Sequence, residues 1–168
     1  MTLRNQLKNF PLFFGLTLPQ LDMLEQIVHE KSYHANELIT REGDAGDELF
    51  LLLKGKVEIS KSLTLLVGRG DLDTREKSLT QLKAEDAVYF GEMAILQEQR
   101  VRSATTKTVE DCIVGIIKKD DLLALFEKDP DFGYKVIRNI AQTLAERLEK
   151  ANQDILKLTT AFSLALQG

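Results

Sequence analysis

The sequence predicts a mainly β domain with helices at both ends. Between residues 31 and 118, short runs rich in apolar residues alternate with turns that contain Gly and Asp, a spacing typical of an all-β sandwich or barrel. On either side of this region, apolar residues recur at helical spacing. A chain of 168 residues has room for one hydrophobic core. We therefore expect an N-terminal helical segment (residues 1–30), a β domain (31–118) and C-terminal helices (119–168).

One short helix is predicted before the β domain. Thr17 is a suitable N-cap residue, Pro19 fits the first turn, and apolar residues follow at helical spacing as far as Val28. The polar stretch 68–77 is predicted to be an exposed hairpin tip. The predicted strands are residues 37–40, 49–53, 57–66, 78–82 and 111–117, with turns at residues 43–47 and at Gly55.

The C-terminal region is predicted to hold a short helix and then a much longer one, separated by Asp129-Pro130-Asp131. In the long helix, apolar residues recur at alternating steps of four and three, as in the a/d seam of a coiled coil. They are Ile137, Ala141, Leu144, Leu148, Ala151, Ile155, Leu158, Phe162 and Ala165. Two interpretations are open, a homodimer through this seam or packing of the helix on its own β domain. We favour the dimer because so long a helix extends beyond a barrel of this size.

Composition narrows the classes of partner. The formal net charge of −4 and a pI near 5.3 do not provide the positive field that binds a nucleic-acid backbone. The N-terminal apolar stretch is short and interrupted by Pro11, and nothing approaches the roughly 20 apolar residues of a membrane span. The single cysteine, Cys112, lies in an apolar run and is expected in the core. We expect a cytoplasmic protein with no membrane or direct nucleic-acid partner.

The most informative segment is Phe90-Gly91-Glu92-Met93-Ala94-Ile95-Leu96, followed by Arg102-Ser103-Ala104-Thr105. A glycine at the start of a helical turn exposes backbone N–H groups to an anion. Arg102 can add a planar pair of donors and Ser103 a hydroxyl, while Glu92 can accept a hydrogen bond from a sugar hydroxyl. Together these groups suit a ribose phosphate.

These two segments resemble the phosphate-binding cassette of the cyclic-nucleotide-binding domains, which occur in bacterial catabolite activators, in regulatory subunits of cyclic-nucleotide-dependent kinases and in gated ion channels. Residues 12–16, 42–50 and 53–57 also resemble parts of that family, so the resemblance covers roughly residues 10–150. It implies an eight-stranded jelly roll (double-stranded β-helix) with helices at both ends and the cassette inside the roll.

The resemblance also implies a role for each site residue. Glu92 would bind the ribose 2′-hydroxyl, and Arg102 and Ser103 would hold the phosphate. The remaining implied residues are Gly91, Met93 and Ala94, whose backbone groups would lie near the cyclic phosphate, and Asn152, which would cap the base from the long helix. A serine at position 103 favours cAMP over cGMP. The implied function is a sensor in which nucleotide binding shifts a hinge near residues 119–130 and so moves the long helix.

The sequence departs from the family pattern in two places. Residues 85–89 lack the glycine that usually precedes the cassette, so the chain is expected to enter it differently. The catabolite activators continue into a DNA-reading helix-turn-helix, whereas this sequence stops at Gly168, which makes direct DNA regulation doubtful. The chain is interpreted either as a free dimer that presents a surface to an effector protein or as the sensor part of a longer regulator.

A dimerising module with a silent pocket is the main alternative to a sensor. In that module Glu92 and Arg102 would form a buried ion pair without a ligand. We favour a ligand because two unpaired buried charges are costly, and we expect the neighbouring Arg100 to be solvated.

An enzyme is not predicted. The metal sites of other jelly rolls need two or three histidines, and only His29 and His34 are present, both before the barrel proper. Ser103 and Cys112 lack a recognisable base. We expect neither a catalytic residue nor a metal, and no cofactor apart from the nucleotide ligand.

Overall fold

The computed structural model describes residues 2–67, 71–97 and 101–167. Its helices are α1 (Leu3–Leu7), the 3-10 turn η1 (Pro11–Phe13), α2 (Leu18–Glu25), the 3-10 turn η2 (Ala84–Asp86), α3 (Glu92–Leu96), α4 (Lys119–Lys128) and α5 (Pro130–Gln167). Its strands are β1 (His29–Tyr33), β2 (Leu38–Thr40), β3 (Glu48–Lys54), β4 (Lys56–Val67), β5 (Asp71–Lys83), β6 (Tyr89–Phe90), β7 (Thr105–Thr108) and β8 (Cys112–Lys118).

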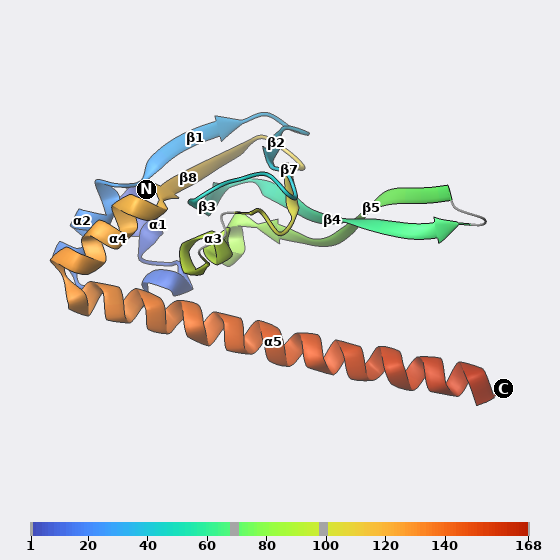
Figure 1. Ribbon diagram of the computed structural model, residues 1–168. Helices are drawn as coiled ribbons and strands as arrows, with labels where there is room; N and C mark the ends of the chain where they lie inside the picture. Colours follow the sequence, from blue (N-terminus) through green and yellow to red (C-terminus); the bar gives the residue numbers. More distant parts are fainter. Residues whose placement is uncertain (1, 68–70, 98–100, 168) are drawn as a thin grey trace.

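Within the described residues, the strands form two antiparallel four-stranded sheets, ordered β1-β8-β3-β6 and β2-β7-β4-β5. Figure 1 shows α1, α2 and α4 gathered at one end of this roll, α3 below its middle, and α5 running along beneath it. The predicted jelly roll with flanking helices and a long C-terminal helix is therefore confirmed.

Strand β3 separates two parts of the core because both of its faces are buried. Phe50 and Leu52 face the interior of the roll, where they join Val114 and the predicted core residue Cys112. Leu49 and Leu51 belong to a second apolar cluster with the helices. The same strand therefore holds the roll together and attaches the helices to it.

The N-terminal segment is more complex than predicted. Thr17 does cap α2, since its hydroxyl oxygen accepts a hydrogen bond from the backbone N–H of Gln20 at 3.4 Å. However, α1 and η1 precede this helix, and β1 begins at His29, so the expectation of one helix was wrong. Strand β1 was missed because His29–Tyr33 is mostly polar and exposed, and shows no alternation of apolar residues.

The polar stretch 68–77 is not a hairpin tip as a whole. Residues 71–77 continue strand β5, which pairs with β4 from Lys56↔Lys83 to Val67↔Asp71 with one register shift between Ile59 and Ser60, while residues 68–70 lie outside the described residues. Figure 1 shows this ribbon extending well beyond the rest of the roll. The turn was predicted too early because pairing with β4 extends the strand through residues whose own pattern is that of a turn.

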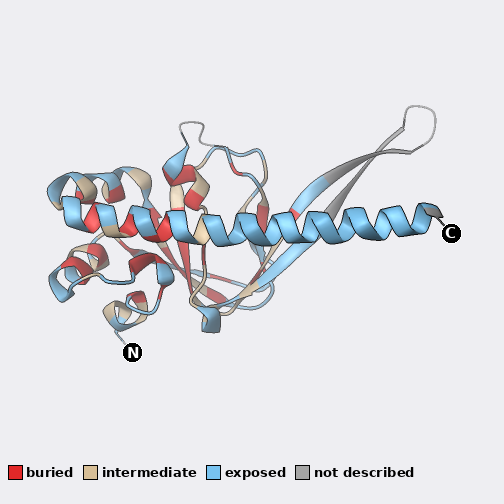
Figure 2. Cartoon of the chain, turned by 90° about the horizontal axis from the view of Figure 1, so that it is seen from below, coloured by how far each residue is buried: buried red, intermediate tan, exposed pale blue. Residues whose placement is uncertain are grey.

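Helix α5 has 38 residues and is therefore about 57 Å long. Its first half packs on its own domain through the buried residues Phe132, Val136 and Ile140, whereas its second half is exposed along its whole length, as Figure 2 shows. The Asn139 amide group reinforces the docked half by donating to the backbone carbonyls of Leu12 and Phe14 at 3.0 and 2.9 Å. None of the described helices has the length and apolar character needed to span a membrane.

Candidate functional site

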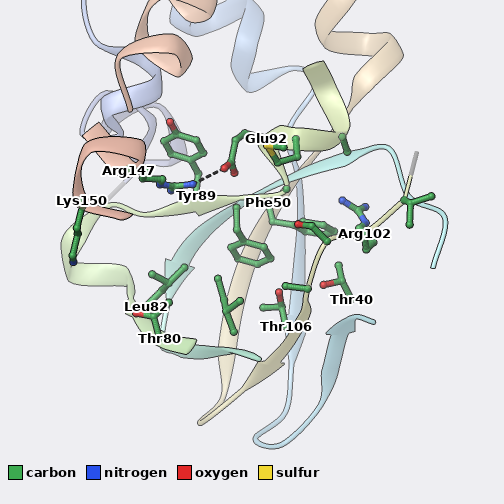
Figure 3. Close-up of a pocket in the computed structure, with 18 residues that line it drawn as sticks. Thr40, Phe50, Thr80, Leu82, Tyr89, Glu92, Arg102, Thr106, Arg147 and Lys150 are labelled. Carbon is green, nitrogen blue, oxygen red and sulfur yellow. Dashed lines mark hydrogen bonds and ion pairs between the residues drawn. The ribbon is translucent and has the colours of Figure 1, made fainter. Parts of the chain in front are cut away.

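A cavity of about 440 Å³ opens between the inside of the roll, helix α3, the segment before β7 and helix α5. Figure 3 shows side chains from all four regions converging on it. Its lining residues are Thr40, Phe50, Ile59, Thr80, Leu82, Tyr89, Phe90, Gly91, Glu92, Met93, Ala94, Val101, Arg102, Ser103, Ala104, Thr106, Arg147 and Lys150. The volume lies in the usual range for small-molecule sites.

Gly91 shapes the wall from which α3 begins. Its φ of +85° lies in the left-handed region, and a Cβ atom there would come within 2.8 Å of the Glu48 carbonyl oxygen. Only glycine combines this conformation with such a close approach. The preceding residue, Phe90, stacks on Phe50 with ring centroids 5.1 Å apart, which fixes strand β6 against β3. Glu92 is thereby placed in the first turn of α3, at the edge of the cavity.

Arg102 is held in place from two sides. Its backbone is bonded to the turn after β2, with its N–H donating to the Asp44 carbonyl at 2.8 Å and its carbonyl accepting from the Gly43 N–H at 2.9 Å. Its guanidinium pairs with the Glu48 carboxylate, donates to the Glu48 carbonyl at 2.8 Å and lies 5.0 Å from the centre of the Phe50 ring. The side chain is thus oriented before any ligand arrives.

Only 8% of Arg102 is exposed. This burial lowers the pKa of its guanidinium, and the nearby Glu48 and Asp47 carboxylates oppose that shift. Because arginine keeps its proton throughout the physiological range, the cavity carries a buried positive charge at this end.

Glu92 has a different partner from Arg102. Glu92 is 6% exposed, and its Oε1 accepts a hydrogen bond from Nη1 of Arg147 on α5 at 2.5 Å, the contact drawn as a dashed line in Figure 3. The Glu92–Arg102 pair that the silent-module alternative implied is therefore wrong, and so is the premise that the two charges would be unpaired without a ligand. Each is matched inside the chain by a residue about 55 positions away, Glu48 or Arg147, and sequence reasoning assigned neither partner.

Tyr89 lies behind this second ion pair. The Arg147 guanidinium is 5.7 Å from the centre of the Tyr89 ring, so the ring and the Glu92 carboxylate together hold Arg147. Burial raises the pKa of the Tyr89 hydroxyl, and the neighbouring Thr143 side chain on α5 opposes this shift. The tyrosine therefore contributes its ring rather than a charge to the contact with α5.

Most of the predicted site residues come together. Gly91, Glu92, Met93, Ala94, Arg102 and Ser103 all line the cavity. The Ala94 N–H donates to the Gly91 carbonyl at 3.1 Å, so this donor already closes the turn of α3. Arg100 lies outside the described residues.

Asn152 is the predicted residue that is not brought to the cavity. It is exposed on α5 and does not belong to the lining, to which α5 contributes Arg147 and Lys150 instead. Its role as a cap on the base stays a prediction.

The chain enters the cassette without the expected glycine. Ala87 adopts φ +47° and ψ +51° at the end of η2, which is the left-handed conformation that glycine adopts most readily. An alanine therefore makes the turn that leads into β6.

A model of the cyclic nucleotide-binding domain matches residues 30–129, which is more than half of the chain. The chain belongs to the cyclic nucleotide-binding domain family. The family is one of ligand-binding regulatory domains rather than catalytic ones, in agreement with the non-catalytic reading of the sequence.

Curated relatives support this membership. This cyclic nucleotide-binding domain is 31% identical over 149 residues to the cyclic AMP receptor protein of Thermus thermophilus, covering 89% of the chain and 62% of that protein. It is also 31% identical over 96 residues to a cGMP-dependent protein kinase of Drosophila melanogaster, covering 57% of the chain and 12% of the kinase. A match to glutaminase 1 of Bradyrhizobium diazoefficiens covers 23% of that protein. The chain thus spans less than two thirds of the length of these relatives.

Solved structures show the same fold. The catabolite activator protein of Thermus thermophilus matches with a TM-score of 0.71 at 31% identity, covering 89% of the chain and 63% of that protein. The regulatory domain of Toxoplasma gondii PKA, solved with cAMP, matches with a TM-score of 0.61 at 27% identity, covering 73% of the chain and 42% of that structure.

Proposed function

We propose that this domain is a sensor that binds a cyclic purine mononucleotide, cAMP in preference to cGMP, in the 440 Å³ cavity. The observation that carries the proposal is the pairing, in one cavity, of a buried and pre-oriented guanidinium from Arg102 with a buried carboxylate from Glu92. A guanidinium binds an anion and a carboxylate accepts a hydrogen bond from a hydroxyl group, so the two together suit a small molecule that carries both a phosphate and a sugar hydroxyl.

In the proposed complex, the phosphate lies against Arg102 and the Ser103 hydroxyl. It competes with the Glu48 carboxylate for the guanidinium, which costs part of the binding energy. The Oε2 atom of Glu92 accepts a hydrogen bond from the ribose 2′-hydroxyl, since the contact with Arg147 uses Oε1. Apolar side chains such as Ile59 and Leu82 supply the surface on which a purine rests. The preference for cAMP is proposed from Ser103.

The signal is proposed to leave the site through α5. This helix supplies Arg147 and Lys150 to the cavity wall, so an occupant contacts it directly. A ligand shifts a conformational equilibrium only by the difference between its contacts in the two states. We propose that these contacts change the pose of α5 about its junction with α4, at Asp129.

We propose that the protein transmits the signal as a homodimer, joined through the exposed half of α5. The seam residues Leu148, Ile155, Leu158 and Phe162 are 60–71% exposed and have no surface of their own domain to pack on. We favour a homodimer that acts on an effector protein in the cytoplasm. The similarity to a cyclic AMP receptor protein supports a regulatory role for this domain.

A dimerising module with a silent pocket is the second candidate. It is favoured by one observation, namely that both buried charges already have partners within the chain, so neither needs a ligand.

Calorimetry separates these candidates. We expect saturable heat with cAMP, weaker binding of cGMP and none of linear 5′-AMP at the same concentrations. Replacement Arg102→Leu is expected to weaken cAMP binding about 10- to 100-fold, because it removes charge-assisted hydrogen bonds of roughly 1.5–3 kcal/mol each. Arg138→Leu is the matched control, since Arg138 is an exposed residue of α5 that does not line the cavity. Absence of heat with either cyclic nucleotide would favour the silent module.

A further inference from the structure

The cavity has a second charged residue that the cassette does not supply. Lys150 lines it from α5, and Figure 3 shows Lys150 at the opposite end from Arg102, on the same side as Thr80 and Leu82 of β5. Phe50 lies between the two ends. The cavity is therefore elongated, with Arg102 at one end and, at the other, Lys150 beside Arg147, whose guanidinium is paired with Glu92.

The ammonium group of Lys150 is not engaged by the acidic residues nearest to it along the helix. Glu146, four residues before it, accepts a hydrogen bond from Gln142 at 3.3 Å, and Asp154, four residues after it, pairs with Lys157 at 3.4 Å. Across the described ranges, no side chain forms an ion pair or hydrogen bond with Lys150. A lysine that could pair on its own helix instead borders the cavity with all its donors available.

The position of Lys150 relative to the ligand follows from the proposed function, on which this inference rests. With the phosphate at Arg102 and the sugar at Glu92, the end lined by Thr80, Leu82 and Lys150 is left for the base. Leu82 offers the base an apolar contact, and Lys150 offers its edge a hydrogen-bond donor. Contacts at this end touch the base itself, so they can distinguish one base from another directly.

An ammonium group donates hydrogen bonds and accepts none. Guanine presents two adjacent acceptors, N7 and O6, and lysine is a common partner of that pair. Adenine places an amino group, which is a donor, beside its N7. A cation at this point therefore gains one more favourable contact from a 6-oxopurine and meets a donor on a 6-aminopurine.

We propose that Lys150 reads the purine base and favours the 6-oxopurine edge. Lys150 contacts the base and favours cGMP, whereas Ser103 contacts the phosphate and favours cAMP. The two residues therefore have opposite effects on the selectivity. The preference for cAMP that Ser103 supports is therefore small in this protein, and removing Lys150 widens it.

The test compares the affinities of three ligands, measured by calorimetry on the full chain and on Lys150→Met. Cyclic GMP and cyclic inosine monophosphate share N7 and O6, and only the former carries the 2-amino group. We expect both to lose about five- to tenfold in affinity in the variant, while cAMP changes less than twofold. Methionine keeps the length and apolar stem of lysine, so packing against the roll is preserved.

Lys157→Met is the matched control. Lys157 lies seven residues further along α5, hence on nearly the same face, but it does not line the cavity, and its replacement is expected to leave all three affinities unchanged. An unchanged ratio of cGMP to cAMP affinity in Lys150→Met overturns the inference while leaving the proposed function intact. Equal losses for all three ligands also overturn it, because they indicate a general attraction of the charge for the phosphate. If the unmodified protein binds none of them, the proposed function fails and the inference fails with it.

Discussion

Gly46 lies so close to Arg102 that the site depends on the absence of a side chain there. A Cβ atom at this position would collide with the Arg102 guanidinium, although the Gly46 backbone is not in the left-handed region and tolerates alanine. The obstacle is the end of a flexible side chain, so the fold can absorb the change by moving Arg102. A side chain at position 46 is therefore expected to weaken ligand binding rather than to lower the free energy of unfolding.

We therefore predict that Gly46→Ala lowers the affinity for cAMP about tenfold by displacing the guanidinium, since charge-assisted hydrogen bonds depend strongly on geometry. The midpoint of thermal unfolding should move little. Calorimetry on the variant, on Arg102→Leu and on the double variant checks this, because the alanine should have no further effect once Arg102 is absent. A gain in affinity, or an additive loss in the double variant, contradicts the prediction.

The junction of α4 and α5 is the element on which any movement of the long helix must turn. Asp129 caps α5 through Oδ1, which accepts from the Phe132 N–H at 3.0 Å, and its Oδ2 accepts from the buried Gln20 side chain at 2.9 Å. Gln20 also donates to Asp131 at 3.0 Å, and Lys135 pairs with Asp131 at 2.6 Å. This network ties α2 to the start of α5, so it resists rotation of the helix.

These contacts hold the pKa of Asp129 below its ordinary value, first through the hydrogen bond from Gln20 and then through that from the Phe132 N–H. A carboxyl group whose pKa is depressed by folding stabilises the protein above its unfolded pKa, and this contribution is lost as the pH falls through the folded pKa. We therefore predict that Asp129→Asn is less stable than the unmodified protein at neutral pH. The difference should begin to shrink as the pH falls below about 4, where the carboxyl of the unfolded chain takes up a proton, and should disappear only below the depressed pKa of the folded carboxyl.

Urea unfolding at pH 7, 5 and 3 measures this difference. Asp154→Asn serves as the control, because Asp154 lies on the exposed half of α5, where it pairs with Lys157 one turn away. A stability difference for Asp129→Asn that is the same at all three pH values would show that the charge of Asp129 is irrelevant to the junction.

Sequence patterns predicted those elements whose periodicity and turns are local. The Thr17 cap, the strands after Gly43 and Gly55 and the long C-terminal helix follow from neighbouring residues. Strand β1 and the polar part of β5 were missed because their own sequence pattern does not indicate a strand. They are strands because they pair with a neighbouring strand, β8 or β4. Pairing between strands overrides weak local propensity.

The same distinction applies to the site. Gly91, Glu92, Arg102 and Ser103 belong to two short segments, so a local motif was enough to predict them. Arg147 and Lys150 reach the cavity only because the first half of α5 docks on the roll through residues such as Val136. That docking depends on tertiary packing, and the heptad seam, which was the strongest signal in the helix, lies on another face. The two interpretations of α5 are therefore compatible, since the first half packs on the domain, with Leu144 of the seam against the core, and the seam from Leu148 onward stays exposed.

At the scale of the whole molecule, the exposed apolar residues on the seam of α5 lead to the last prediction. Pairing of two seams would bury Ile155 and Phe162, which are 60% and 66% exposed, and burial of such a side chain is worth about 1.5–3 kcal/mol. We predict that the protein is a dimer at micromolar concentration and that Ile155→Glu with Phe162→Glu converts it to a monomer, as measured by sedimentation or light scattering. Leu156→Glu with Leu164→Glu is the matched control, because these leucines are equally exposed, at 68% and 65%, but lie off the seam. If the two pairs of substitutions act alike, or if the unmodified protein is already a monomer, the seam is not the interface and the output of α5 must reach a different partner.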